Sequence, residues 1–186
     1  MKTSFKEYLR ECELIESFEI TDKYKRLSKS EADKLWIQLL NTREDQLPGL
    51  YANRPQLKSY ILKNEGREYL IYSFVKDTVL EVHFHDIDTP IDGTEYDDKK
   101  LTRNSQAVFS SVMSIVLKEL EERPSRKIRI SAPTGRETLY KKIIDKTLKK
   151  YSIEKDISLK MAKDEYSRDK FDFLLESIDN VYIEIS

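Results

Sequence analysis

The residues best suited to chemistry lie in one stretch, EVHFHDIDTPIDGTEYDD, which runs from Glu81 to Asp98. It contains both histidines of the chain and a concentration of aspartate and glutamate. The part TVLEVHFHDI alternates as a β-strand does, so Glu81, His83 and His85 are expected on one face and Asp86 on the other. A carboxylate or an imidazole with a pKa near the working pH can remove a proton from a substrate. The strand therefore offers three candidate general bases.

A metal site is an alternative use of the same residues. His83 and His85 could bind a metal ion from one strand face, with Asp86 or Asp88 as a third ligand. Asp86 is expected on the opposite face, however, and the chain has no third histidine. We therefore predict no metal site. A polar strand face near the edge of a sheet explains the two histidines equally well.

Other polar residues have simpler interpretations. Five lysines lie in the segment 137–151, but helical lysines are commonly just solvated, and no aromatic residues interleave with them as on a base-stacking surface. The turn SAPTGR, residues 131–136, could receive an anion at the start of a helix, but it lacks the Gly-Lys-Ser/Thr of a phosphate loop. Cys12 falls on the apolar side of a predicted helix, where it is expected to pack.

Composition narrows the class of protein. The chain has 186 residues, of which 36% are charged, yet its net charge is only −1. This balance removes the basic field that nonspecific nucleic-acid binding needs, so no nucleic-acid partner is expected. No apolar run approaches the roughly 18–20 residues of a membrane span, and the charged N-terminus does not resemble a signal peptide. A single cysteine cannot form a disulfide within the chain, so a cytoplasmic location is predicted. Because no membrane span or signal peptide is recognised, no membrane partner is expected.

The elements that must position these residues follow from periodicity and turn signals. We expect helices over 3–18 and from Ser28 or Ser30 to about Leu40, the latter with a capping box from Ser30 to Asp33, and then a loop with a turn at Pro48-Gly49. The remaining predicted elements are strands 56–63, 67–75 and 78–87, helix 105–123, strand 127–132, helix 137–151, strands 156–162 and 180–185, and a strand or helix at 171–177. Asn104 or Ser105 is the expected cap of the long helix. The predicted buried residues of helix 105–123 are Ala107, Val108, Val112, Ile115 and Val116, and those of helix 137–151 are Leu139, Ile143 and Leu148. A hairpin turn is expected at Asn64-Glu65-Gly66.

This order predicts an α+β fold, ααβββαβαββ, with one βαβ crossover inside a mixed sheet. We expect a single domain over residues 1–186, with a helical part up to residue 53 and the sheet with its crossover helices from residue 57.

The segment from Ser105 to Tyr151 carries a resemblance to a known family. It resembles the GNAT acyltransferase superfamily, and especially uncharacterised GNAT-like proteins of tailed phages, which share a "VF..V" helix, a strand ending in Ser-Ala and an "R..LY" helix. The resemblance covers roughly residues 60–151 and implies a GNAT-like mixed sheet. It also implies a coenzyme A site at the start of the long helix, at Arg103, Asn104 and Ser105. Under it, Glu81, His83 or His85 would be the general base and Tyr140 the general acid.

One segment departs from the family pattern. The family holds the coenzyme A pyrophosphate with a glycine-rich loop, whose backbone N–H groups contact the phosphates. The corresponding stretch here, DTPIDGTEYDDKKLTRNSQA, has one glycine, Gly93, and five carboxylates, at Asp88, Asp92, Glu95, Asp97 and Asp98. These carboxylates repel a pyrophosphate, although Lys99, Lys100 and Arg103 compensate in part.

The sequence therefore leads to one prediction of function and one alternative. We expect a phage-type accessory or virion-associated protein that binds a protein partner in the host cytoplasm or virion, without a cofactor and without normal acetyl-coenzyme A catalysis. The alternative is an acyl-coenzyme A-dependent N-acyltransferase that uses acetyl-coenzyme A.

Overall fold

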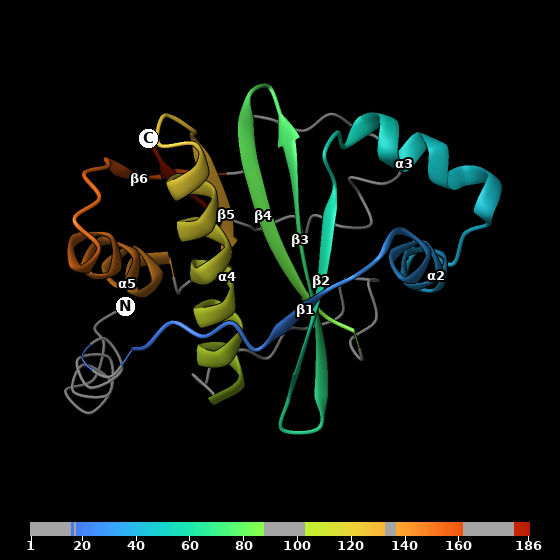
Figure 1. The fold of residues 1–186 in the computed structure, drawn as a ribbon, viewed down its shortest axis with the longest axis horizontal. Coiled ribbons are helices and arrows are strands. Elements are labelled where there is room, and N and C mark those ends of the chain that lie inside the picture. Colours follow the sequence, from blue (N-terminus) through green and yellow to red (C-terminus); the bar gives the residue numbers. More distant parts are fainter. Residues whose placement is uncertain (1–15, 17, 88–102, 133–136, 162–180) are drawn as a thin grey trace.

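The fold is a mixed seven-stranded sheet with helices on both faces, seen in a computed structural model that describes residues 16, 18–87, 103–132, 137–161 and 181–186. The strands are β1 (Tyr24–Arg26), β2 (Lys58–Asn64), β3 (Arg67–Lys76), β4 (Val79–Asp86), β5 (Ile128–Ala132), β6 (Ile157–Met161) and β7 (Val181–Ile185). The helices of the described residues are α2 (Lys29–Leu39), the 3-10 helix η1 (Glu44–Gln46), α3 (Leu47–Asn53), α4 (Arg103–Glu122) and α5 (Glu137–Lys150). The predicted α+β class with a mixed sheet is confirmed (Figure 1).

Strands β2, β3 and β4 form a meander with two-residue turns. The hairpin turn predicted at Asn64-Glu65-Gly66 is shorter by one residue, because Asn64 pairs with Arg67 and only Glu65 and Gly66 form the turn. Both turn residues have positive φ, 48° and 80°, which matches the twist of a tight hairpin. The second turn, Asp77-Thr78, also has two positive φ values, 48° and 72°, although neither residue is glycine.

The predicted βαβ crossover is confirmed. The chain leaves β4, returns through α4 and enters β5, which pairs with β4 in parallel. Strand β7 then pairs antiparallel with β5, and β6 pairs antiparallel with β7, so the sheet order is β1-β2-β3-β4-β5-β7-β6. The last strand in sequence is therefore internal, and β6 lies at an edge of the described sheet.

Each face of the sheet has its own apolar cluster. One cluster joins α4 and α5 to the strands through residues such as Val82, Phe109 and Ile130. The other joins α2 and α3 to the opposite face of β3 through Trp36, Tyr72 and their neighbours. In Figure 1, α4 and α5 lie at the left of the view and α2 and α3 at the right. The face opposite α4 and α5 is the one that carries the candidate bases.

Most of the residues predicted to form the buried stripe of the long helix α4 are buried in the structure. Val108, Val112, Ile115 and Val116 are buried, and Ala107 is half-buried. The helix begins at Arg103, so Asn104 and Ser105 lie inside its first turn instead of capping it. The inward residues predicted for α5 are also buried, namely Leu139, Ile143 and Leu148.

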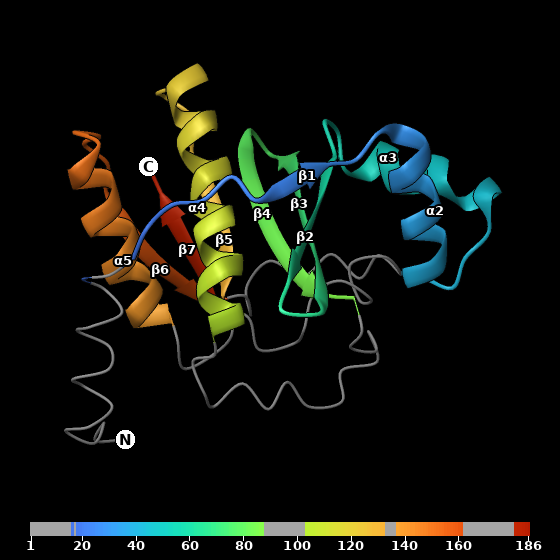
Figure 2. The same ribbon diagram turned by 60° about the horizontal axis from the view of Figure 1, so that its bottom comes forward.

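The segment through β1 was not predicted as a strand. It passes across α4 before it joins the edge of β2 (blue in Figures 1 and 2). Serines of α4 hold it, because Ser110 donates to the carbonyl oxygen of Glu19 and Ser114 donates to Asp22. Three residues are too few to show an alternating pattern, so periodicity does not indicate this strand.

Two predictions in the N-terminal part are wrong. The capping box of α2 joins Ser28 to Glu31, whereas Ser30 and Asp33 lie inside the helix. The expected loop after Leu40 contains η1 and α3, and the predicted turn at Pro48-Gly49 lies within α3. Proline lacks an amide hydrogen, but the first turn of a helix does not require one, so Pro48 fits in the first turn of α3, where a loop turn was predicted. Leu47 and Leu50 are buried and anchor it.

Several predicted features fall outside the described residues. They are the first helix apart from Glu16 and Phe18, Cys12, the acidic stretch from residue 88 to residue 102, the turn residues 133–136 and the segment 171–177.

Candidate functional site

The three candidate bases share one face of β4, as the alternation predicted. The pairing of β3 with β4 places His83 opposite Tyr72, Glu81 opposite Phe74 and His85 opposite Leu70. Glu81 and His83 are each only 2% exposed, whereas His85 is half-buried. Two of the three are thus inside the folded chain and not on an open strand face.

His83 lies among aromatic rings. Its imidazole is nearly parallel to the ring of Tyr72, with centroids 5.1 Å apart, and to the ring of Phe74, with centroids 5.5 Å apart. Its Nε2 atom lies 3.3 Å from Oε2 of Glu81. Packing by two rings and a bond to a carboxylate fixes the orientation of the imidazole.

Glu81 belongs to a row of charges that crosses three strands. Parallel pairing of β4 with β5 places Arg129 beside Glu81, and antiparallel pairing of β5 with β7 places Glu184 beside Arg129. The guanidinium Nη1 of Arg129 lies 3.6 Å from Oε1 of Glu81, and its Nε donates to Oε2 of Glu184 at 3.0 Å. Arg129 therefore joins two largely buried carboxylates across the middle of the sheet.

This setting keeps Glu81 ionised. Burial alone would raise the pKa of the carboxyl group, but the hydrogen bond to His83 and the electrostatic attraction of His83, Lys76 and Arg129 outweigh it. The net result is a pKa below the ordinary value of 4.5. A carboxylate whose proton affinity is lowered in this way is a weak general base near neutral pH.

Sequence reasoning missed Arg129 and Glu184. A signal was present, because each charge stands between two isoleucines, in IRI and IEI, and so must occupy the face opposite the isoleucines. The order of β5 and β7 in the sheet was not available from the sequence, and without it the two charges could not be assigned to Glu81.

The parallel strands β4 and β5 separate after Val82 and Ile130, toward their carboxyl ends. Their pairing covers only Leu80–Val82 with Ile128–Ile130, and β4 then runs on to Asp86 and β5 to Ala132 with no further pairs between them among the described residues. The carboxyl ends of neighbouring parallel strands are a common place for ligands in sheets of this kind. Where the two strands separate, their backbone N–H and C=O groups could form hydrogen bonds with a ligand that contains amides.

Tyr140 is not placed with the candidate bases. It lies in α5, is buried, and stacks on Phe109 of α4 with ring centroids 4.1 Å apart. Both rings belong to the apolar cluster on the α4 and α5 face, whereas Glu81 and His83 project from the opposite face. The structure thus brings together the candidate bases but not the candidate acid.

The coenzyme-site candidates Arg103, Asn104 and Ser105 are the first residues of α4, and their side chains lie outside the described part of the structure. Asp86, the suggested third metal ligand, lies on the face opposite the histidines, where it accepts a bond of 3.0 Å from Nη1 of Arg67. Within the described residues, no three ligating side chains come together as a metal site would need.

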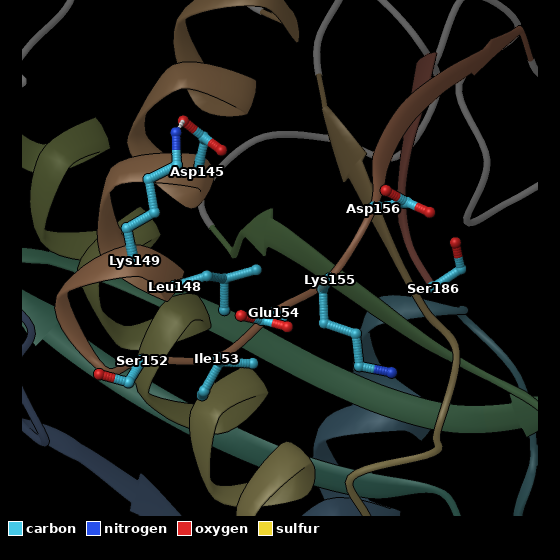
Figure 3. A pocket seen from close by; sticks show the side chains of 9 residues that line it. All are labelled: Asp145, Leu148, Lys149, Ser152, Ile153, Glu154, Lys155, Asp156 and Ser186. Atoms are coloured by element: carbon cyan, nitrogen blue, oxygen red, sulfur yellow. Dashed lines mark hydrogen bonds and ion pairs between the residues drawn. The ribbon is translucent and has the colours of Figure 1, made fainter.

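A hollow of about 680 Å³ lies elsewhere, where the end of α5 meets the start of β6 and the end of β7 (Figure 3). Leu148 and Ile153 lie near the centre of this view and are its apolar lining. The other lining residues are Asp145, Lys149, Ser152, Glu154, Lys155, Asp156 and Ser186. Lys149 and Asp145 form an ion pair of 2.7 Å, so part of the charge at its rim is already neutralised. The hollow is open and contains none of the candidate catalytic residues.

No protein-family model matches the chain, and neither a curated protein nor a solved structure is detectably similar to it. Among the described residues, no helix combines the length and apolar character that a membrane span requires.

Proposed function

We propose that this protein acts by binding a macromolecular partner, most simply another protein, and does not perform standard acetyl-coenzyme A chemistry. The observation that carries the proposal is the separation of the candidate catalytic groups. Glu81 and His83 are buried within one set of contacts, and Tyr140 is stacked beneath Phe109 in another. A base and an acid that act on one substrate must both reach it, and these side chains lie on opposite faces of the sheet.

The contacts of Glu81 support a structural role for it. Its two oxygen atoms are directed at His83 and at Arg129, and its pKa is lowered by them. Such a carboxylate stabilises the charges beside it at neutral pH instead of taking up protons. The row from Glu81 to Glu184 then serves to hold β4, β5 and β7 in register.

The class of partner rests on the resemblance already described. The segment from α4 to α5 resembles GNAT-like proteins of tailed phages, and the parallel step from β4 to β5 followed by β7 and β6 is compatible with that GNAT-like fold. We therefore propose an accessory or virion-associated role, in the host cytoplasm or the virion, with a protein as the partner.

The separation of β4 from β5 favours a second candidate function, acyl-coenzyme A-dependent N-acyl transfer. An amide-containing chain such as the pantetheine arm of coenzyme A could lie between the two strands. In that case Glu81 or a histidine would be the base, Tyr140 the acid, and Arg103, Asn104 and Ser105 would be closest to the phosphates.

An assay of thiol release separates the two proposals. Purified protein is incubated with acetyl-coenzyme A and a panel of amines, peptides and polyamines, and free coenzyme A is measured over time. The partner-binding proposal predicts no release above the buffer rate. Release that falls at least tenfold in both Glu81→Gln and Tyr140→Phe, with folding intact by circular dichroism, would establish the acyltransferase instead.

A further inference from the structure

We infer that the outer edge of β6 is a docking site for an acidic, extended segment of a partner protein, which adds to the sheet as an eighth strand. The inference rests on the proposed partner-binding function and names the surface and the chemistry of the partner.

The edge of β6 is open in the part of the chain that the structure describes. Strand β6 pairs with β7 on one side only. Asp156 and Ser186 exchange both backbone hydrogen bonds, each of 3.0 Å. Such pairs alternate along an antiparallel ladder, so the N–H and C=O groups of Ile157 and Leu159 are directed away from β7. The outer edge thus offers donors and acceptors in the spacing that another strand requires.

Leu159 supplies an apolar contact at the middle of this edge. It is 41% exposed, and it is one of only two large hydrophobic residues exposed among those the structure describes. The second, Tyr151, lies just beyond the end of α5, which packs against β6. A strand added outside β6 would cover part of Leu159 and so remove apolar surface from water.

The charge of α5 determines which kind of strand fits. This helix lies against β6 and β7, and it carries five lysines but only two acidic residues, in a protein of net charge −1. Lys142, Lys146, Lys149 and Lys150 are exposed, and of these Lys149 forms the ion pair with Asp145. A strand beside β6 would run next to this basic helix, so acidic side chains on it would be attracted and lysines repelled.

The same charge disfavours a second copy of the chain as the occupant. Pairing of two β6 edges about a twofold axis would bring two α5 helices close together, each with an excess of lysine. Like charges at that distance oppose association. The hollow beside the start of β6, with Leu148 and Ile153 in its lining, extends the edge and could receive an apolar side chain of the incoming segment.

The test uses a fluorescent, end-blocked eight-residue peptide of alternating glutamate and valine, titrated with the full-length protein and followed by anisotropy. We expect saturable binding that weakens at least fivefold between about 50 and 300 mM salt, because exposed charges are screened. The same peptide with N-methylated amides, and a peptide of alternating lysine and valine, are expected to bind at least tenfold more weakly.

Two variants assign the binding to the edge. Leu159→Pro removes an amide hydrogen that is directed away from β7, so it should preserve the internal ladder and weaken peptide binding at least tenfold. Leu159→Ala keeps this amide and loses only the side chain, so it should weaken binding less. The pair Lys142→Glu and Lys150→Glu should reduce the salt dependence without unfolding the protein.

Several outcomes would overturn the inference. They are the absence of saturable binding, equal binding of the N-methylated peptide, an unaltered affinity in a folded Leu159→Pro variant, and a dimer seen by light scattering that Leu159→Pro dissociates. None of these results depends on acetyl-coenzyme A. If the peptide fails and thiol release is also absent, the partner-binding proposal stands and its surface is elsewhere.

Discussion

Arg129 joins Glu81 to Glu184 in the interior of the sheet, so the stability of three strands depends on one side chain. Removing Arg129 alone leaves Glu81 and Glu184 without the cation that they share. We expect Arg129→Met to lower the free energy of unfolding by about 3–5 kcal/mol. Urea denaturation followed by circular dichroism measures this change.

The matched control removes the charges together. Arg129→Met combined with Glu81→Gln and Glu184→Gln should recover much of the lost stability, because no uncompensated charge stays buried. If the single variant is as stable as this triple variant, the charge row does not hold the strands.

The lowered pKa of Glu81 predicts a dependence of stability on pH. Because the pKa in the folded protein lies below the ordinary value of 4.5, ionised Glu81 stabilises the fold above pH 4.5. This contribution is lost as the pH falls through the pKa of the folded state. Glu81→Gln should therefore be less stable than the natural protein at pH 7, and the two should converge as the pH falls below 4.5 and through the pKa of the folded state.

Urea midpoints measured between pH 7 and pH 3 check this convergence. His85→Gln is the matched control, since His85 is on the same strand face but is half-buried. A difference between Glu81→Gln and the natural protein that is constant over the whole range would contradict the assigned contacts.

At the scale of elements, the two hairpin turns differ in how well their residues suit them. Thr78 has φ 72°, a conformation that is unfavourable for a β-branched residue, whereas Gly66 has φ 80° at the corresponding turn. We expect Thr78→Gly to stabilise the protein by about 1 kcal/mol and Gly66→Ala to destabilise it by about 1 kcal/mol.

No atom lies within 4 Å of a Cβ added at Gly66, so the cost of Gly66→Ala comes from the backbone and not from a clash. Melting temperatures of the two variants provide the measurement. An unchanged or lower melting temperature for Thr78→Gly would show that the turn gains more from the threonine side chain than it loses in strain.

The elements with strong periodicity were predictable from the sequence. The alternation in TVLEVHFHDI placed Glu81, His83 and His85 on one face, and the apolar spacing of α4 identified its buried stripe. Short elements were not predictable, because β1 has three residues and α3 begins with a Leu-Pro-Gly sequence that is typical of turns. Their positions depend on tertiary packing, through Leu50 in one case and the serines of α4 in the other.

For the molecule as a whole, the sequence predicted only part of the candidate site. Neighbours along one strand could be inferred, but neighbours on different strands required the sheet order. The contact of Arg129 with Glu81 is a consequence of that order, and the separation of Tyr140 from both follows from the face of the sheet on which α5 packs. The same holds for β6, which is an edge of the described sheet because β7 inserts between it and β5.

We propose that the molecule is a scaffold in which Glu81, His83 and Tyr140 serve the structure, while its surface binds a partner. Calorimetric titration with acetyl-coenzyme A, at low salt and near neutral pH, tests this most directly. We expect no heat of binding and no rise in melting temperature at about 1 mM ligand. Saturable binding in the micromolar range, with a matching rise in melting temperature, would contradict it and establish the separated strands β4 and β5 as a cofactor site.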